Sequence, residues 1–289
     1  MESFAALRAH VETLAAALPP FGSGSGYRTT ASPGAASRQR SGQGEDFWQY
    51  RSQTPEDTAG AIDWRRSATG DELFIREHEL QSARLLSLWV DGSAGFDWRS
   101  DARLPSKADR ARVLLTAIAM RYCETGDMAG VMGGANGASM TSHSPGRMLD
   151  DFLHIDGESR VPAVPEPQAA HLILASDFYQ PLDDLRSWIE REAGEGRTGI
   201  LLQVVDPKET DFPYSGRVRF RLPGTGLEKI FGRTETMRDD YLARFAERQD
   251  ALRTLCQSVG WQFLSHKTSD EPLETAFALL QLLSVEGAG

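Results

Sequence analysis

The chain has 289 residues, of which 40% are hydrophobic and 25% charged, and its formal net charge is −10 at pH 7. This is the composition of a globular protein with a sizeable core, and the acidic balance argues against nucleic acid or an anionic membrane as the main partner. No apolar run approaches the roughly 20 residues that cross a bilayer, and no export signal follows Met1. We therefore expect a cytoplasmic protein without a transmembrane segment.

An amphipathic helix is predicted at the beginning of the chain, over residues 3–18. Its apolar residues recur at helical spacing, namely Phe4, Leu7, Val11, Leu14 and Leu18. The segment that follows is rich in glycine, serine and arginine and is loop-like, but it ends in Phe47, Trp48 and Tyr50, which favour burial. We therefore predict that residues 1–80 form an N-terminal extension packed on the domain that follows.

Buried strands and amphipathic helices alternate over residues 81–289. The predicted strands cover residues 83–91, 127–134, 169–177, 199–206 and 261–266, and residues 216–224 alternate like one arm of a hairpin. The predicted helices cover residues 106–123, 145–154, 181–193, 234–259 and 271–284. This alternation predicts an α/β domain of the doubly wound class, with a mainly parallel sheet and helices on both of its faces.

The cysteines and histidines do not indicate a metal site. Cys123 and Cys256 lie in predicted helices, so we expect reduced structural thiols in a cytosolic protein. The histidines lack metal-ligand spacing, and we expect His10 to face solvent and the others to lie at the surface or at an edge: His78, His143, His154, His171 and His266.

Three predicted strands end in an aspartate, namely Asp91, Asp177 and Asp206. Ligands of open α/β sheets bind beyond the carboxyl ends of the strands, which makes this edge the candidate site. Aspartate is also common wherever a strand passes into a loop, so each residue alone is a weak signal.

The segment "VDGSAGFD" admits two interpretations. In the first, Asp91 is the nucleophile of a metal-dependent phosphohydrolase, but Ser93 stands where such enzymes carry a second aspartate, and the chain lacks a GxxxxGK[ST] phosphate loop. In the second, the segment is a metal-ion-dependent adhesion site with the candidate ligands Asp91, Ser93, Thr141 and Asp177. Hard oxygen ligands suit Mg²⁺, but Gly95 replaces the second serine of that motif, so we expect weak or absent binding.

Several segments occur in the order typical of one bacterial family. These are "GQGEDFWQYR", "AIDWRRSA" and "LFIREHELQSARLLSLWVDGSAG", followed by "ILASDF", "VVDPKETDFPYSGRVRF" and "WQFLSHKTSDEP". Over roughly residues 26 to 285 the chain resembles the "domain of unknown function 58" family, which is von Willebrand factor A-like. It departs from the family pattern at Gly95 and at "TPEDTAG", where the family has a Pro-Gly-Asp-Asp turn.

The resemblance implies a function as well as a fold. Members of this family are often encoded beside a MoxR-type AAA+ ATPase, and the pair is thought to act in protein maturation or complex assembly. The implied function is a non-enzymatic protein-interaction module that is an adaptor of such an ATPase, with a degenerate metal-ion-dependent adhesion site. The candidate partner-binding residues are Arg65, Arg66, Phe96 and Trp98. The phosphohydrolase that uses Asp91 remains the alternative.

The "IDW" element has a structural interpretation and a functional one. We predict that Trp64 buries its ring, that Asp63 pairs with a neighbouring arginine or caps the local turn, and that this element, which begins at Ile62, holds the extension on the domain. The functional alternative is a basic docking surface that contains Arg65 and Arg66.

Overall fold

The computed structural model describes residues 2–21, 41–52, 62–68, 73–79, 84–135, 145–155, 161–221 and 226–286. The chain divides into two compact units, one made of Met1–Gly26 with Arg84–Gly289 and the other of Tyr27–Ala83. The first helix belongs to the larger unit, because Leu7, Val11 and Leu14 are part of its hydrophobic core. This division differs from the predicted grouping of residues 1–80 into one extension.

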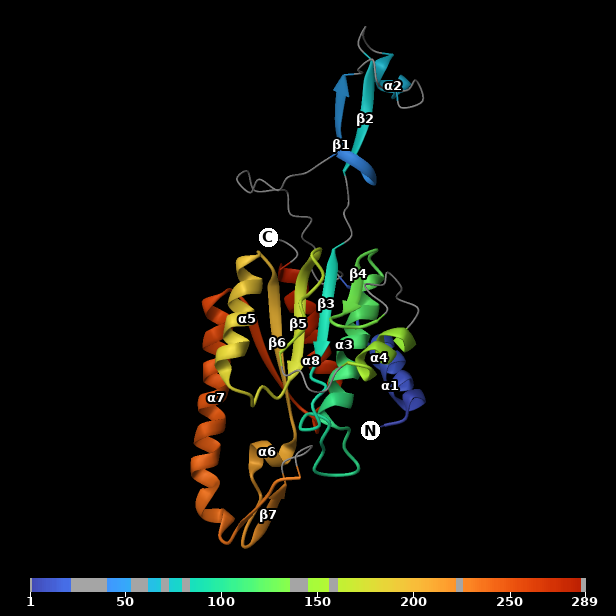
Figure 1. Cartoon of the computed structure of the whole chain (residues 1–289). Helices are drawn as coiled ribbons and strands as arrows, with labels where there is room; N and C mark the ends of the chain where they lie inside the picture. Colours follow the sequence, from blue (N-terminus) through green and yellow to red (C-terminus); the bar gives the residue numbers. More distant parts are fainter. Residues whose placement is uncertain are drawn as a thin grey trace. The chain divides into compact units, whose positions relative to one another are not determined.

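A five-stranded sheet forms the centre of the larger unit (Figure 1). Its strands are β3 (Leu85–Val90), β4 (Met128–Val131), β5 (Ala169–Ser176), β6 (Thr198–Val205) and β9 (Gln262–Lys267), in the order β4-β3-β5-β6-β9. Every neighbouring pair is parallel, as the sequence predicts. All residues of β3 are buried, which explains why a strand covered on both faces appears in the sequence as a continuous apolar run.

Helices cover both faces of this sheet (Figure 1). On one face, helices α1 (Phe4–Ala17), α3 (Lys107–Cys123), α4 (Pro145–Leu153) and α8 (Pro272–Glu286) share a core with Leu88 and Ile173. On the other face, α5 (Leu182–Gly194) and α7 (Arg238–Ser258) pack with Trp89 and Leu174. The architecture is thus a mixed α/β fold with a parallel central sheet, compatible with the doubly wound class.

Cys123 in α3 and Cys256 in α7 are buried and free, as expected for structural thiols.

A 3₁₀ turn, Thr234–Met237, precedes α7 and accounts for the first residues of the predicted helix 234–259. None of the helices within the described residues combines the length and apolarity that crossing a bilayer requires.

Two elements extend from the carboxyl edge of the sheet after β6. Helix α6 (Pro207–Asp211) begins directly after the strand, and β7 (Val218–Arg221) pairs antiparallel with β8 (Glu228–Phe231). The hairpin arm predicted over residues 216–224 is therefore present over Val218–Arg221, and residues 222–224 lie outside the described residues. Figure 1 shows α6 and this ribbon near the end of α7 where that helix begins.

The smaller unit contains β1 (Ser41–Ser52), α2 (Trp64–Ser67) and β2 (Phe74–Glu79). The two strands pair antiparallel in a two-stranded sheet with register shifts. The prediction that residues 41–52 are loop-like was therefore wrong, because pairing with β2 overrides the low strand propensity of the glycines and serines.

Gly199 allows a close approach between β6 and a buried tryptophan. A Cβ atom at Gly199 would lie 2.4–2.6 Å from ring atoms of Trp261. Trp261 is 2% exposed, packs edge-on against Trp188, and donates its Nε1–H to the Arg197 carbonyl at 3.0 Å. The ring therefore has little room to move when the glycine is replaced.

We expect Gly199→Ala to lower the free energy of unfolding by about 2 kcal/mol, because overpacking forces Trp261 from its position. Urea unfolding followed by circular dichroism measures the change. Gly194→Ala is the matched control, since a Cβ atom at this helical position meets nothing within 4 Å and alanine is the better helix former. Equal unfolding midpoints for the two variants would show that the Trp261 contact is not restrictive.

Candidate functional site

The carboxyl edge of the central sheet is where the fold places a ligand site. From β3 the chain continues to β4 on one side, whereas β5 pairs with β3 on the other side, so the strand order reverses between β3 and β5. Asp91 and Asp177 follow these two strands, and Asp206 follows the adjacent β6. The three aspartates therefore lie at the edge and switch point where such sheets bind ligands.

Asp91 is held by its own neighbours. It is 2% exposed; its Oδ1 accepts a hydrogen bond from the Ser93 backbone N–H at 2.8 Å, and its Oδ2 accepts one from Ser176 Oγ at 2.7 Å. Its own N–H donates to the Ala175 carbonyl at 2.9 Å. Both carboxylate oxygens thus fix the loop after β3 against β5.

The other candidates of the adhesion motif do not complete a ligand set. Ser93 Oγ accepts a hydrogen bond from the Phe96 N–H at 3.4 Å, which uses it within its own turn. Gly95 has space for a side chain, since the nearest atom to an added Cβ is Ser93 Oγ at 4.0 Å. Thr141 lies outside the described residues.

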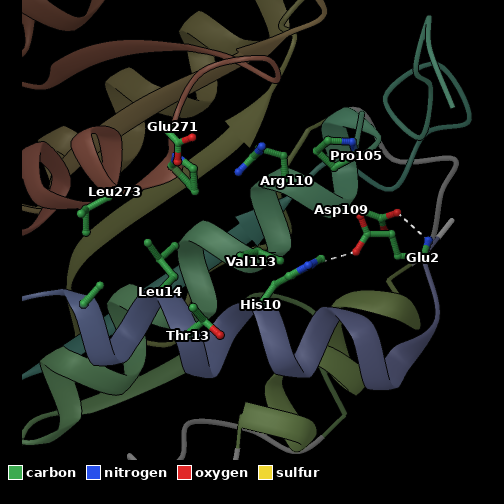
Figure 2. Close-up of a pocket in the computed structure, with 12 residues that line it drawn as sticks. Glu2, His10, Thr13, Leu14, Pro105, Asp109, Arg110, Val113, Glu271 and Leu273 are labelled. Atoms are coloured by element: carbon green, nitrogen blue, oxygen red, sulfur yellow. Dashed lines mark hydrogen bonds and ion pairs between the residues drawn. The ribbon is translucent and has the colours of Figure 1, made fainter. Parts of the chain in front are cut away.

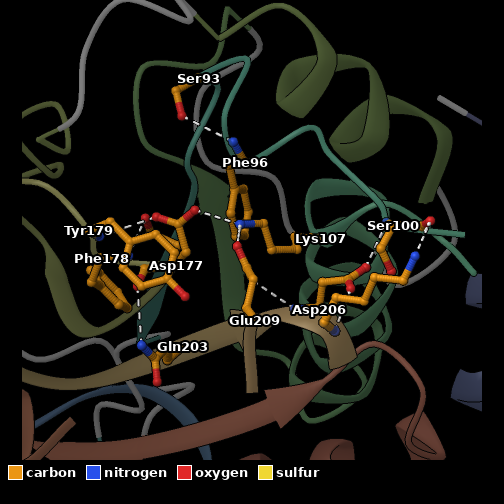
Figure 3. A network of polar contacts seen from close by, with 12 residues as sticks. Ser93, Phe96, Ser100, Lys107, Asp177, Phe178, Tyr179, Gln203, Asp206 and Glu209 are labelled. Carbon is orange, nitrogen blue, oxygen red and sulfur yellow. Dashed lines mark hydrogen bonds and ion pairs between the residues drawn. The ribbon is translucent and has the colours of Figure 1, made fainter. Parts of the chain in front are cut away.

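A lysine occupies the position beside Asp177. Lys107 Nζ lies 2.7 Å from Asp177 Oδ2 and 2.8 Å from Glu209 Oε1, and the Lys107 side chain is 1% exposed. Figure 3 shows the ammonium group between these two carboxylates. The two carboxylates come from the loop after β5 and from α6, so a single buried cation joins two segments of the edge.

Aromatic rings surround the same ammonium group. Lys107 Nζ lies 5.9 Å from the centroid of Phe96, 5.8 Å from that of Trp98 and 5.4 Å from that of Tyr179. A cation within about 6 Å of an aromatic face is attracted by the ring quadrupole. The rings therefore replace part of the hydration that Lys107 loses on burial.

The charge state of this cluster follows from its contacts. Burial acts to lower the pKa of Lys107, but the carboxylates of Asp177 and Glu209 outweigh it, and the pKa lies above its ordinary value of 10.5. Burial raises the pKa of Glu209, and the positive charge of Lys107 opposes that rise. Lys107 thus remains an ammonium ion at neutral pH.

The loop that carries Asp177 is fixed from two sides. Phe178 adopts a left-handed conformation with φ 55°, which is uncommon for a residue with a side chain. Gln203 Nε2 donates to the Asp177 carbonyl at 3.2 Å, and Arg248 Nε donates to the Phe178 carbonyl at 2.8 Å. Arg248 of α7 therefore holds the turn that presents Asp177 to Lys107.

Glu209 is positioned by a capping box at the start of α6. Asp206 Oδ1 accepts from the Lys208 N–H at 2.9 Å, and Glu209 Oε2 accepts from the Asp206 N–H at 2.8 Å, which leaves Oε1 for Lys107. Asp206 Oδ2 also accepts from the Ser100 N–H at 2.9 Å. Asp206, the third strand-end aspartate, therefore connects the loop after β3 to α6. It does not contact Lys107 itself but positions Glu209, which does.

These residues do not fit a divalent metal ion. Both oxygens of Asp91 accept hydrogen bonds within the edge, Gly95 supplies no ligand atom, and Asp177 is paired with a fixed positive charge. Among the described residues no group of three or more His, Cys, Asp or Glu side chains is arranged to hold a metal ion. The candidate site is a cluster in which the Lys107 ammonium group pairs with the carboxylates of Asp177 and Glu209.

Comparison with known proteins places the chain in a family. The family described as "Protein of unknown function DUF58" matches residues 49–251. The chain belongs to this DUF58 family. Uncharacterized proteins of Mycobacterium bovis and Mycobacterium tuberculosis are similar to it, at 26% identity over 252 residues that cover 78% of this chain and 76% of each relative.

Two solved structures show a distant likeness. The conserved hypothetical protein BatB from Bacteroides thetaiotaomicron has 14% identity over 72% of this chain and 100% of that one, with a TM-score of 0.43. An aerotolerance-related membrane protein from Bacteroides fragilis has 13% identity over 69% and 98%, also with a TM-score of 0.43. These scores are too low to carry an argument about function.

Two of the predicted partner-binding residues, Phe96 and Trp98, lie beside Lys107 in the loop after β3. Phe96 is 0% exposed, because its ring packs in the core and against Lys107, so it offers no surface to a partner. Trp98 is half-buried, and its backbone carbonyl accepts from the Lys107 N–H at 3.1 Å. The loop after Asp91 is therefore part of the lysine cluster, and Phe96 is a core residue.

The IDW element forms a turn tied to β2. Ile62 is buried, and Asp63 Oδ1 accepts from the Arg65 N–H at 3.1 Å, which agrees with the predicted cap of the local turn. Asp63 N–H also donates to the Phe74 carbonyl at 2.8 Å. The predicted burial of Trp64 is wrong, since its ring is 61% exposed at the start of the short helix α2.

Of the two arginines predicted to form a docking surface, Arg65 is exposed, as a docking residue requires, and the side chain of Arg66 lies outside the described residues.

The histidines agree only in part with the prediction that they lie at the surface or at an edge. His10 and His154 are exposed as predicted, whereas His171 and His266 are buried at 5% and 2% exposure. The prediction was wrong for His171, which lies on the covered central strand β5 and bonds the Thr198 hydroxyl. His266 lies on the edge strand β9, as the prediction allowed, but its side chain is buried and bonds the Thr275 hydroxyl.

A second candidate site is a cavity of about 460 Å³ between α1, α3 and the start of α8 (Figure 2). Its lining residues are Glu2, His10, Thr13, Leu14, Ala17, Pro105, Asp109, Arg110, Val113, Glu271, Pro272 and Leu273. Its charged groups engage one another, since Glu2 N–H donates to Asp109 Oδ2 at 2.8 Å and Glu2 Oε2 lies 3.1 Å from His10 Nδ1. Acidic and basic side chains both line this cavity, so its charge favours neither an anionic nor a cationic ligand.

Lys107 and Glu209 are the site residues that the sequence analysis missed. One signal was present, because Lys107 directly follows the N-cap Ser106 and so places a cation at the positive end of the α3 dipole. A lysine in that position indicates a compensating carboxylate nearby. The segment "DPKE", an aspartate followed three residues later by a glutamate, is a second signal, since it is typical of a capping box.

Proposed function

We propose that this protein is a non-enzymatic protein-interaction module, an adaptor of a MoxR-type AAA+ ATPase in protein maturation or complex assembly. The family resemblance supports the identity of the partner, because members are often encoded beside such an ATPase. We also propose that the larger unit is a von Willebrand factor A-like domain, which its parallel sheet and covered faces support.

The exposed ribbon β7–β8 is the observation that carries this proposal. On one face of the ribbon Phe220 packs against Phe212, Tyr214 and Phe231. Side chains alternate along a strand, so Arg219 and Arg221 lie on the opposite face, where both are exposed. Aromatic packing therefore supports the ribbon from within and leaves an arginine-bearing face outward.

This outer face differs in charge from the rest of the chain. Residues 216–233 contain five basic residues and one acidic residue, whereas the whole chain has a net charge of −10. Glu228 lies 2.6 Å from Arg221 and 3.5 Å from Arg219, so one carboxylate is shared by two arginines. Ile230, opposite Arg219 in the register, is 48% exposed. Arginine beside exposed apolar surface is typical of protein interfaces, and the surplus charge fits an acidic surface on the ATPase.

The phosphohydrolase alternative has less support. A carboxylate nucleophile must reach a substrate phosphorus atom, whereas Asp91 is 2% exposed and both of its oxygens accept hydrogen bonds from the loop and from Ser176. A phosphatase assay with added Mg²⁺ tests this alternative directly. Turnover that Asp91→Asn abolishes would replace the adaptor proposal with an enzymatic one.

We expect Arg219→Glu/Arg221→Glu to weaken capture of the ATPase encoded by a neighbouring gene by about tenfold or more, because charge reversal opposes both encounter and binding. Surface-immobilised ATPase and the purified full chain, measured at low and physiological salt, give the affinity and its salt dependence. We expect the wild-type affinity to fall with salt and that of the variant to be nearly independent of salt.

Arg8→Glu/Arg253→Glu is the matched control for this measurement. It makes the same change in net charge at two exposed arginines elsewhere on the unit. Equal loss of affinity in both variants would mean that only net charge matters and would remove the ribbon from the interface. If wild-type protein captures no such ATPase, with or without ATP, the adaptor proposal itself fails.

A further inference from the structure

The surroundings of Lys107 have the composition of a cation site. Two carboxylates and three aromatic rings face its ammonium group, and they come from the loop after β3, the loop after β5 and helix α6. We propose that the ammonium group of Lys107 is the permanent cation of this sheet edge and holds the position between Asp177 and Glu209 that a divalent metal ion would take in its absence.

The location of Lys107 supports this assignment over an ordinary ion pair. Lys107 is the first residue of α3, where the helix dipole disfavours a positive charge, and its side chain is 1% exposed. Burial of an unpaired ammonium is strongly unfavourable. A cation placed against both of these effects requires compensation, and the five groups around it supply that compensation from separate segments of the chain.

The two carboxylates suit a divalent cation once the lysine is removed. Asp177 Oδ2 and Glu209 Oε1 both bond the same Nζ atom, so both oxygens are directed toward one point. Mg²⁺ and Mn²⁺ are bound by one or two carboxylates together with water. While the ammonium is present, its charge repels a second cation and its atoms fill the space. The wild-type edge is thus a cation site that needs no metal, whatever partner the protein has.

Titration of the full chain with MnCl2 tests the proposal. Wild-type protein is expected to show no saturable binding at this edge, by calorimetry and by the paramagnetic relaxation of water protons. Lys107→Ala is expected to bind Mn²⁺ at least about tenfold more tightly than wild type, since the repelling charge is gone and two carboxylates remain. Lys107→Ala/Asp177→Asn should lose this gain.

Lys208→Ala is the matched control, because this lysine lies beside Glu209 in α6 and its Nζ donates a long hydrogen bond to the Ser100 carbonyl, at 3.4 Å. It should behave as wild type. Asp177-dependent Mn²⁺ binding by the wild-type protein would overturn the proposal, as would a folded Lys107→Ala that binds no Mn²⁺.

If Lys107→Ala does not fold, a comparison of Lys107→Met with a neutral triple variant still tests the proposal. Lys107→Met/Asp177→Asn/Glu209→Gln removes the cation together with both charges that it compensates. If Lys107 acts as the cation of the site, this neutral variant should fold with a higher Tm than Lys107→Met alone, and MnCl2 should raise the Tm of Lys107→Met but not that of the neutral variant. A neutral variant no more stable than Lys107→Met, with no Mn²⁺ effect on either, would show that the lysine acts through packing alone.

Discussion

Replacing Lys107 with methionine is expected to lower the free energy of unfolding by about 3–5 kcal/mol at neutral pH in the absence of divalent ions. Methionine has similar length and keeps the apolar contacts of the lysine stem, so the change removes chiefly the charge. Asp177 and Glu209 then remain beside each other without the cation that bonds both. Carboxylates with little access to water and no cation beside them account for the size of the expected loss.

Urea unfolding at neutral pH, followed by circular dichroism, measures this difference. Lys208→Met is the control, because the Lys208 ammonium makes only a long hydrogen bond to the Ser100 carbonyl and is half-buried. We expect its loss to stay below about 1 kcal/mol. A Lys107→Met variant as stable as this control would mean that the two acids are protonated in the native protein or that water reaches them freely.

The central sheet could be predicted from the sequence because its physical cause is local. A strand covered on both faces must be apolar along its whole length, and "LLSLWV" meets that condition at every residue of β3. The start of α3 was equally local, since Ser106 Oγ accepts from the Asp109 N–H at 3.1 Å as an N-cap does. Patterns of this kind fix strands and helices without knowledge of the tertiary structure.

The smaller unit could not be predicted in the same way. Strand β1 contains "SGQG", residues of low strand propensity, and its formation depends on pairing with β2 more than twenty residues later in the chain. The burial of Trp64 was inferred from the apolar character of the ring, but the hydrogen bonds of Asp63 and Ser67 fix the turn and leave the ring exposed. Backbone hydrogen bonding decided the orientation there, and side-chain hydrophobicity alone was insufficient.

The sequence analysis placed the candidate site at the sheet edge but did not identify Lys107, the cation that lies there. Lys107 is separated by 70 residues from Asp177 and by 102 from Glu209, so only the order of the strands brings the three together. The motif centred on Asp91 directed attention to metal ligands in sequence order. In the structure Asp91 bonds Ser93 and Ser176, and the charge of the edge is supplied by a residue outside the motif.

The buried lysine at the sheet edge changes how the protein can recognise a partner. A bridging metal ion leaves a coordination position open to a partner's carboxylate, whereas the Lys107 ammonium is buried beneath Phe96, Trp98 and Tyr179. Recognition through that edge would therefore require the partner to contact its outer surface. The exposed arginines of the β7–β8 ribbon offer charge that is already accessible, which is why we place the docking surface there.

The stability of this protein is expected to fall by about 3 kcal/mol between pH 6.5 and pH 4 through one histidine. His266 is 2% exposed, its Nδ1 lies 2.7 Å from Thr275 Oγ1, and its Nε2 has no hydrogen-bond partner within the described residues. Burial lowers the pKa of His266 from its ordinary value of 6.5 to about 4, and the Arg110 charge adds to this effect, while Asp270 opposes it.

The direction of the pH effect follows from these two pKa values. Above pH 6.5 the histidine is neutral in both states, so its full contribution to stability is present. As the pH falls toward 4, the unfolded chain takes up a proton at this residue and the folded protein does not, which favours unfolding. His171 adds a loss of the same sign, because burial lowers its pKa as well.

His266→Asn isolates the contribution of this residue, since asparagine can retain a hydrogen bond to Thr275 and does not titrate. We expect the variant to be less stable than wild type at pH 7 because of lost packing, but its stability should decline less steeply between pH 6.5 and pH 4. Urea unfolding at half-unit intervals of pH measures the two curves, and His154→Asn, which replaces an exposed histidine, should follow the wild-type curve. Parallel curves for wild type and His266→Asn would mean that the folded protein protonates His266 as readily as the unfolded chain, and that water or an acid reaches Nε2 in the native state.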